Sequence, residues 1–199
     1  MNNSSNVLDP YLRKQSDYEF IKRINQGGFG IVDLVKKVGT EELYAKKSIP
    51  FDDDDECATK YFMRELFALY LFRFKGLPFL YFEGFNFPSR FKGKKIDAYI
   101  ITNYISGGSL SDLIKKKFMQ CDDIPTSKMI IIYGICFALK IMHESDIVHR
   151  DLKPDNILIN DNLEPILADF GFARLIKKED IFITRNIGTL VYMAPEIIT

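Results

Sequence analysis

The sequence has 199 residues, of which 47% are apolar, and it carries 27 basic and 27 acidic side chains. This composition excludes a disordered chain, which combines low hydrophobicity with a high net charge. The balanced charge gives no overall field that would attract nucleic acid or an anionic membrane, so we expect neither as a partner.

The first 16 residues are polar, and we expect them to form a flexible lead-in. The start, Met1–Asn6, has neither the basic nor the apolar region of a signal peptide, and we expect no stretch that spans a bilayer. Cys57, Cys121 and Cys136 are odd in number and widely spaced, which favours free thiols in a reducing compartment. We therefore expect a cytoplasmic or nuclear protein.

Two strands, 18–24 and 31–35, are predicted on either side of a glycine-rich hairpin, Asn-Gln-Gly-Gly-Phe-Gly at 25–30. A third strand is predicted over 43–49, where alternation places Lys47 on the same face as apolar side chains. A lysine on a buried face is costly unless it is paired. Lys47 is therefore a candidate for a specific role.

A helix is predicted over 56–72, with an apolar stripe formed by Phe62, Leu66 and Leu69. Glu65 lies beside this stripe, where a carboxylate needs a cation. We expect Glu65 to pair with Lys47, and Glu56 remains an alternative partner because a helix register inferred from one sequence is uncertain.

The next segments, 77–85 and 98–102, have the character of strands, so the first half should form a five-stranded antiparallel sheet with one helix. Helices are predicted over 110–118 and 127–144. The second of these is apolar on every face, which places it in the middle of a lobe.

The segment 149–156, His-Arg-Asp-Leu-Lys-Pro-Asp-Asn, is a polar loop before a short strand, and Asp169 follows a second short strand. Asp151, Asn156 and Asp169 supply oxygen donors, while Arg150 and Lys153 balance negative charge. Carboxylate and carboxamide oxygens suit Mg²⁺ carried on a phosphate, whereas the lack of a nearby Cys or His pair argues against zinc.

These residues resemble the eukaryotic protein-kinase family, whose catalytic loop reads H-R-D-x-x-x-x-N and whose metal loop reads D-F-G. Ala194-Pro195-Glu196 resembles a third motif of the family. The resemblance implies an α+β, bilobal fold, with an N-lobe at about 17–102, a hinge at 103–107 and a C-lobe at 108–199. Family members have further helices after the third motif, so we expect an incomplete, mainly helical C-lobe in a truncated chain.

The resemblance also implies a role for each polar residue of the loops, with ATP and Mg²⁺ as cofactors. Asp151 would accept the proton of the attacking hydroxyl, Lys153 would neutralise the γ-phosphate, and Asn156 and Asp169 would hold Mg²⁺. Lys47, held by Glu65, would bind the α- and β-phosphates. His149 would be structural.

The ATP-binding positions implied by the resemblance are Ile24, Asn25, Gly27, Gly30, Val32, Ala45, Lys47, Glu65, Asn103, Ile105 and Leu158. Asn25 replaces the first glycine of the family pattern, so we expect a less pliable loop there. Backbone groups near Asn103 and Ile105 would bind the adenine edge, and Thr102 would lie behind the ring.

The expected function is transfer of the γ-phosphoryl group of Mg-ATP to serine or threonine hydroxyls of proteins, because Lys153-Pro154 resembles the serine/threonine branch. Thr184 is a possible phosphorylation site for an upstream kinase, with Arg150 as the phosphate receptor. The alternative is a nucleotide-binding scaffold without transfer activity, either a pseudokinase or an inactive fragment.

Overall fold

The computed structural model describes residues 8–28, 30–50, 56–76, 78–87, 98–116, 125–176 and 188–198. The chain forms two compact units. The first comprises Met1–Phe62 and Tyr81–Tyr104, and the second comprises Met63–Leu80 and Ile105–Thr199. The change of unit after Tyr104 falls inside the segment predicted as the hinge.

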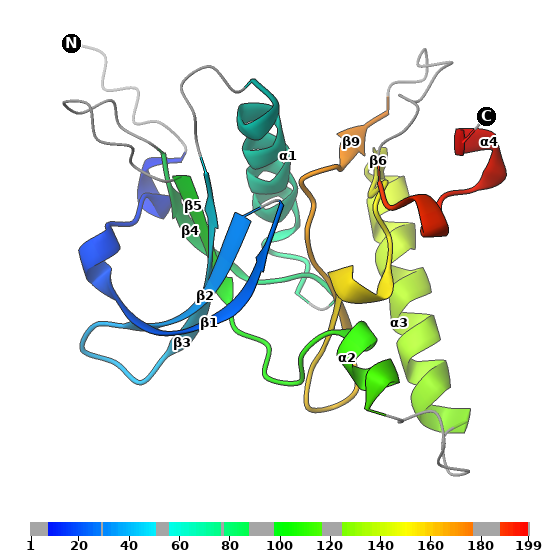
Figure 1. Ribbon diagram of the computed structural model, residues 1–199, viewed down its shortest axis with the longest axis horizontal. Helices are drawn as coiled ribbons and strands as arrows, with labels where there is room; N and C mark the ends of the chain where they lie inside the picture. Colours follow the sequence, from blue (N-terminus) through cyan, green and yellow to red (C-terminus); the bar gives the residue numbers. More distant parts are fainter. Residues whose placement is uncertain are drawn as a thin grey trace. The chain divides into compact units, whose positions relative to one another are not determined.

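The first unit contains a five-stranded antiparallel sheet, as predicted (Figure 1). Its strands are β1 (Tyr18–Gly27), β2 (Gly30–Lys37), β3 (Leu43–Ile49), β4 (Phe82–Asn86) and β5 (Ala98–Asn103). They are arranged in the order β1-β2-β3-β5-β4. Lys47 therefore lies on the central strand of the sheet.

The sheet buries apolar side chains on both faces, which the predicted alternation did not anticipate. Tyr44, which lies on the opposite face of β3 from Lys47, packs edge-on against Tyr18, with 5.8 Å between the ring centroids. The two tyrosines belong to a buried cluster with Val35, Tyr99 and Ile101. Leu43, on the same face of β3 as Lys47, is exposed.

The prediction of a flexible lead-in is wrong for residues 8–16, which pack against the sheet. Two short 3-10 turns, η1 (Asp9–Tyr11) and η2 (Gln15–Asp17), flank a stretch that runs along β4. The N–H of Arg13 donates to the carbonyl of Phe85 at 2.9 Å, and the hydroxyl of Tyr99 donates to the carbonyl of Arg13 at 2.8 Å. These two hydrogen bonds attach the backbone of Arg13 to β4 and β5.

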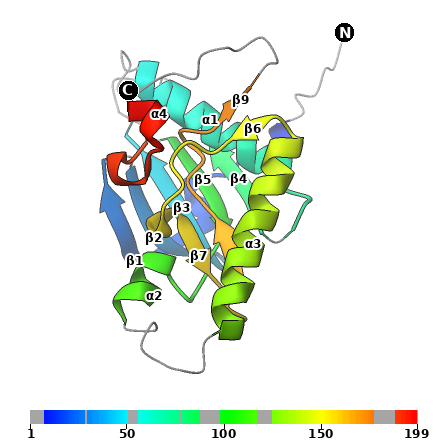
Figure 2. The ribbon, with the colours of Figure 1, turned by 90° about the vertical axis from the view of Figure 1, so that its right-hand side faces the viewer.

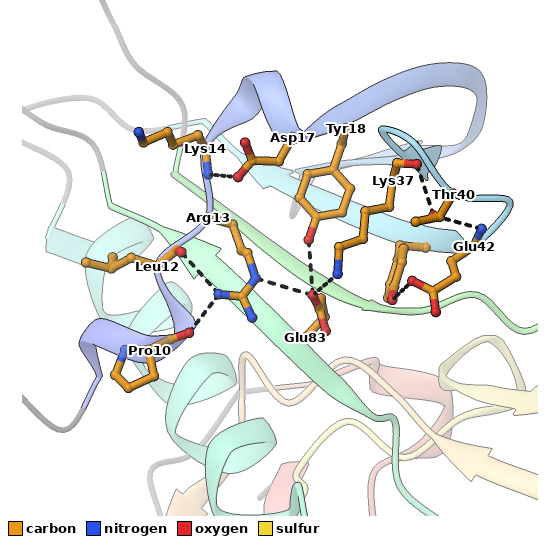
Figure 3. A network of polar contacts seen from close by, with 11 residues as sticks. Pro10, Leu12, Arg13, Lys14, Asp17, Tyr18, Lys37, Thr40, Glu42 and Glu83 are labelled. Carbon is orange, nitrogen blue, oxygen red and sulfur yellow. Dashed lines mark hydrogen bonds and ion pairs between the residues drawn. The ribbon is translucent and has the colours of Figure 1, made fainter.

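Glu83 is the polar centre of this attachment (Figure 3). Its Oε1 accepts from Nε of Arg13 at 3.3 Å, from Nζ of Lys37 at 3.2 Å and from the hydroxyl of Tyr18 at 3.4 Å. The Glu83 residue is buried, so the two cations offset the cost of placing a carboxylate there. Burial, followed by the charge of Glu83, raises the pKa of Tyr18.

Helix α1 covers Glu56–Phe72, the range predicted from the sequence. The sequence predicts the whole helix in the N-lobe, whereas its part from Met63 onward groups with the second unit. The reason is aromatic packing. The ring of Phe72 stacks on Phe79 with 4.3 Å between centroids, and both rings lie 6.3 Å from Phe170.

The second unit contains two short strand pairs, and one pair lies between the two strands of the other in the sequence. We call these the nested strand pairs. Strand β7 (Ile157–Ile159) pairs with β8 (Pro165–Leu167), and β6 (Ile147–Val148) pairs with β9 (Arg174–Leu175). The remaining elements are the helices α2 (Leu110–Lys115), α3 (Pro125–Glu144) and α4 (Pro195–Ile198) and the 3-10 turns η4 (Pro154–Asn156) and η5 (Leu190–Tyr192). Because one pair encloses the other, the two connecting loops between them are brought together.

Helix α3 lies beside the nested strands (Figure 2). Gly134 allows the close approach, because a Cβ there would collide with the ring of Pro165. Among the described residues α3 is covered on one side only, as expected for an incomplete C-lobe. Ile131, Ala138 and Met142 are buried, whereas Tyr133 and other large apolar residues are exposed.

The expectation that no segment spans a bilayer stays a prediction. Among the described residues, one helix, Thr126–Glu144, is long and apolar enough to cross a membrane by length and composition. The core helix of a soluble protein passes the same test, so this property does not by itself assign a membrane location.

Candidate active site

The loop 149–156 connects β6 to β7, and the carboxylate of Asp151 is its centre. Asp151 is 4% exposed. Its Oδ2 accepts from Nζ of Lys153 at 2.7 Å and from Nδ2 of Asn156 at 2.9 Å. Its Oδ1 accepts from the N–H and the hydroxyl of Thr189, at 2.8 and 2.7 Å. The structure thus brings three predicted residues together and adds Thr189.

The loop from β8 to β9 carries Asp169, and Phe170 anchors it. Phe170 is fully buried and its ring lies 5.3 Å from that of His149. Nε2 of His149 lies 3.1 Å from the carbonyl oxygen of Ala168, and the N–H of Ala168 donates to the carbonyl of Asn156. These contacts join the two loops, which agrees with a structural role for His149.

Two residues of these loops adopt a backbone conformation that is rare for side chains other than glycine. Arg150 has a φ of 66° and Asp169 a φ of 61°. Such residues persist where the surrounding structure over-determines them, and they cluster at functional sites. Here that constraint comes from two buried side chains. His149 precedes Arg150, and Phe170 follows Asp169.

Asn156 and Asp169 fit the predicted role of metal ligands. Nδ2 of Asn156 donates to the backbone and side chain of Asp151, so its amide oxygen is the atom left for a cation. No group of three His, Cys, Asp or Glu residues among the described residues could hold a metal alone. Mg²⁺ often relies on one or two protein oxygens together with substrate phosphates, so this donor set suits a metal that arrives with ATP.

In the first unit, the sheet places the predicted adenine residues and Lys47 on one face. Val32 pairs with Lys47 across β2 and β3, and Ala45 pairs with Thr102 across β3 and β5. Residues directly opposite each other project from the same side of a sheet, and so do residues two apart on one strand. Val32, Ala45, Lys47 and Thr102 therefore form one continuous patch.

Lys47 has a partner that the sequence did not indicate. Its Nζ donates to the hydroxyl of Tyr61 at 3.1 Å and lies 4.9 Å from the centroid of that ring. Tyr61 is buried on the first turns of α1. Glu65, one helical turn further on, is also buried. Its pairing with Lys47 stays a prediction.

The glycine-rich segment is mostly strand, because β1 continues to Gly27, which pairs with Gly30. Gly30 has a φ of 128°, and a Cβ there would collide with the carbonyl oxygen of Ser48, so only glycine fits. Asn25 has no such requirement, since it is not among the described residues with positive φ. The expectation of a less pliable loop at Asn25 stays a prediction.

The remaining residues predicted to bind ATP are divided between the two units. Ile24 is exposed at an irregularity of β1 between the pairs made by Arg23 and Asn25. Asn103 ends β5, where its N–H and Oδ1 bond the backbone of Tyr81. Ile105 and Leu158 belong to the second unit, and both are partly exposed. Contact of these residues with ATP stays a prediction.

The guanidinium group of Arg150 is suited to binding an anion. Its Nε donates to the carbonyl of Phe172 at 2.7 Å, while both Nη atoms are buried and have no hydrogen-bond partner among the described residues. Burial, followed by the charges of Arg64 and Arg174, lowers the pKa of Arg150 to about 10. Arg64 and Arg174 were not predicted as site residues. Thr184, the predicted phosphorylation site, lies outside the described residues.

Comparison with known proteins agrees with this geometry. A family model described as protein kinase domain matches residues 18–199. The chain is 33% identical to the serine/threonine-protein kinase SCH9 of Saccharomyces cerevisiae over 92% of its own length and 21% of the relative. It is 32% identical to mitogen-activated protein kinase 2 of Pneumocystis carinii over 91% of the chain and 50% of the relative.

Mitogen-activated protein kinase kinase 1 of Arabidopsis thaliana is 31% identical over 91% of the chain and 48% of the relative. The chain therefore spans half or less of the length of each of these three proteins.

Proposed function

Because the chain belongs to the protein kinase family, we propose that it transfers the γ-phosphoryl group of ATP to serine or threonine hydroxyls of proteins. The observation that carries this proposal is the buried carboxylate of Asp151, bonded to Lys153, Asn156 and Thr189. A fixed carboxylate beside a fixed ammonium group suits a reaction that depends mainly on positioning and charge.

In this mechanism Asp151 orients the substrate hydroxyl and accepts its proton as the oxygen attacks the γ-phosphorus. The bond between the γ-phosphorus and the β,γ-bridging oxygen breaks, and ADP leaves. Lys153, held at 2.7 Å from Asp151, neutralises charge on the transferred group. Lys47 binds the α- and β-phosphates on the face of the sheet that also carries Val32 and Ala45. Mg²⁺, held by Asn156 and Asp169, would neutralise charge on the phosphate oxygens.

We also propose that an upstream kinase phosphorylates Thr184 and that Arg150 binds the phosphate. The buried, unbonded Nη atoms of Arg150 support this, because a phosphate oxygen would satisfy them with charge-assisted bonds. Arg64 and Arg174 add positive charge at the same place. Replacing Thr184 with alanine should prevent activation by an upstream kinase, and unchanged activation would contradict this assignment.

The replacement Asp151→Asn tests the main proposal. We expect Mg-ATP binding, measured by calorimetry, to be retained and phosphate incorporation into a protein substrate to fall by at least about 100-fold, the scale of general base catalysis. Asp155→Asn is the matched control, because Asp155 lies in the same loop and is exposed. Activity of Asp151→Asn within about tenfold of the parent would contradict the role of Asp151. A parent chain that binds Mg-ATP without transfer would support the scaffold alternative.

A further inference from the structure

Arg23 on β1 makes two polar contacts that the proposed mechanism does not use. Its Nε donates to Oδ1 of Asp33 on β2 at 3.0 Å, and its Nη1 donates to Oε1 of Gln26 at 3.0 Å. Asp33 is 8% exposed, whereas the Arg23 side chain is 48% exposed. A buried carboxylate is costly without a cation, so Asp33 holds Arg23 in place. The guanidinium group of Arg23 thereby connects β2 to the glycine-rich hairpin at 25–30.

An extra residue in β1 makes the contact between Arg23 and Gln26 possible. Strands β1 and β2 lie side by side at one edge of the sheet (Figure 1). On a regular strand, side chains three positions apart point to opposite faces of the sheet. The register of β1 and β2 shifts at Ile24, which has no partner on β2. Because of this bulge, Arg23 and Gln26 both project from the face opposite to Lys47.

Both ends of the glycine-rich hairpin are fixed to the rest of the sheet. At the first end, the N–H of Gln26 donates to Oδ1 of Asn25 at 2.8 Å, in addition to the bond between its side chain and Arg23. At the second end, Gly30 lies against the carbonyl oxygen of Ser48, where a Cβ would collide. Polar contacts therefore hold one end and close packing holds the other.

Arg23 lies behind the hairpin with respect to the predicted nucleotide patch. That patch, which includes Val32, occupies the face of the sheet that carries Lys47, and Asn25 pairs with Val32 on the same face. Because Arg23 projects from the other face, its guanidinium group would act on a nucleotide only through the hairpin. Arg23 is therefore a candidate for positioning the hairpin and not for contact with the phosphates.

We propose that Arg23 is a positioning residue that holds the glycine-rich hairpin in the conformation that binds the phosphates of ATP. This inference rests on the proposed function, which assigns ATP to the same patch. Glycines have more conformational freedom to lose than other residues. A hairpin that is already held before the nucleotide arrives loses less of this freedom on binding, so its affinity for ATP is higher. Asp33 fixes Arg23, and Arg23 fixes Gln26.

Gln26→Leu tests the contact with the least disturbance, because it leaves the buried ion pair of Arg23 and Asp33 intact. Calorimetry should show an affinity for Mg-ATP that is lower by about 3- to 10-fold, the scale of one lost hydrogen bond. Steady-state kinetics should show a KM for ATP that is higher by the same factor and an unchanged kcat, since the contact is equal in the ground state and the transition state. Lys36→Met, which breaks a surface ion pair with Glu41 at the other end of β2, is the control and should bind ATP as the parent does.

A double-mutant cycle separates positioning of the hairpin from a general effect on stability. The variant with both Arg23→Met and Asp33→Leu removes the whole ion pair, because removing one member alone would leave an uncompensated buried charge. It should lose as much affinity for Mg-ATP as Gln26→Leu does. Adding Gln26→Leu to it should cause no further loss, since the two changes break the same contact. Thermal melting followed by far-UV circular dichroism shows whether each variant is folded.

Additive losses in this cycle, or an affinity of Gln26→Leu equal to that of the parent, would refute the role of Arg23. A fall in kcat with an unchanged KM for ATP would refute it too, because positioning of the hairpin acts on binding. A parent chain that binds Mg-ATP but transfers no phosphate would contradict the proposed function alone, since the affinities measured by calorimetry still decide the role of Arg23. A parent chain that binds no Mg-ATP would refute both.

Discussion

The hydroxyl of Thr189 joins Asp151 to Lys153, since it donates to Oδ1 of Asp151 at 2.7 Å and accepts from Nζ of Lys153 at 2.8 Å. Gly188 makes this approach possible. Its φ is 114°, and a Cβ there would collide with the carbonyl oxygen of Arg150. Gly188 and Thr189 thus hold the proposed base, Asp151, and the proposed phosphate-binding Lys153 in one arrangement.

Thr189→Val should lower kcat by about 10- to 100-fold, because a hydrogen bond to a charged group contributes about 1.5 to 3 kcal/mol. The KM for ATP should change little, since the side-chain hydrogen bonds of Thr189 are to Asp151 and Lys153, which act on the transferred group in the proposed mechanism. Thr189→Ser keeps the hydroxyl and should restore most of the activity. Steady-state kinetics on the three proteins decides the matter. A fully active valine variant would mean that Thr189 only occupies the place of a substrate hydroxyl.

Tyr61→Phe should raise the KM for ATP by about 3- to 10-fold and lower kcat less, because Lys47 binds phosphates in the ground state as well as in the transition state. The variant keeps the ring beside Nζ of Lys47 and removes the hydroxyl that accepts its hydrogen bond. Tyr61→Leu removes the ring too and should have a larger effect. The control is Tyr81→Phe, at an exposed tyrosine of the same unit. An unchanged KM in Tyr61→Phe would show that Tyr61 does not position Lys47.

His149 should make stability depend on pH. Burial is the largest cause of its lowered pKa, and the carboxylates of Asp169 and Asp151 act more weakly in the opposite direction. Below the ordinary pKa of 6.5 the unfolded chain therefore binds a proton that the folded chain does not. Stability due to neutral His149 is complete above that pH and is lost as the pH falls toward the folded-state pKa.

Urea unfolding at about pH 8 and about pH 5.5 measures this loss. His149→Gln is expected to be less stable at both values and to lose this part of the pH dependence. His143→Gln removes the only other histidine, which is exposed, and should leave the dependence unchanged. If the glutamine variant at position 149 kept the full dependence, other groups would be responsible.

Glu83→Gln should release the N-terminal segment from the sheet. Removing the charge leaves Arg13 and Lys37 without their shared carboxylate, and we expect a loss of about 1 to 3 kcal/mol in the free energy of unfolding. This estimate is lower than for a fully buried pair, because the Arg13 and Lys37 side chains are 24% and 38% exposed. Trypsin should cleave after Arg13 faster in the variant. Glu19→Gln, at an exposed position of β1, is the control, and equal cleavage rates in both would contradict the attachment.

Local patterns predicted the parts of the fold that depend on nearby residues. Helix α1 has the predicted bounds, because its apolar stripe and its charged first residue are both visible in the sequence. The packing of residues 8–16 was missed, since it depends on contacts between Arg13 and residues about 70 positions away on β4.

The sequence likewise predicted only some of the residues of the candidate site. Motif spacing identified Asp151, Lys153, Asn156 and Asp169, and the structure places the first three in one hydrogen-bonded group. Tyr61 and Thr189 have no motif that marks their contacts, which join them to Lys47 and Asp151 across the chain. The helical spacing of Tyr61 and Glu65, one turn apart, was the available signal for Tyr61. The available signal for Thr189 was Gly188, the residue before it.

The nested strand pairs also set an order for folding. Closing a loop costs more entropy as the chain between its ends lengthens, so the β7–β8 hairpin should form before β6 meets β9. Once the hairpin exists, the effective distance between Ile147 and Leu175 is shorter and the outer pair can close. Pulse-labelled hydrogen exchange should therefore protect Leu158 and Ile166 earlier than Val148 and Arg174, which are the hydrogen-bonded positions of the two registers. A folding intermediate between these two steps has the β7–β8 hairpin but not yet the arranged loops that contain Asp151 and Asp169.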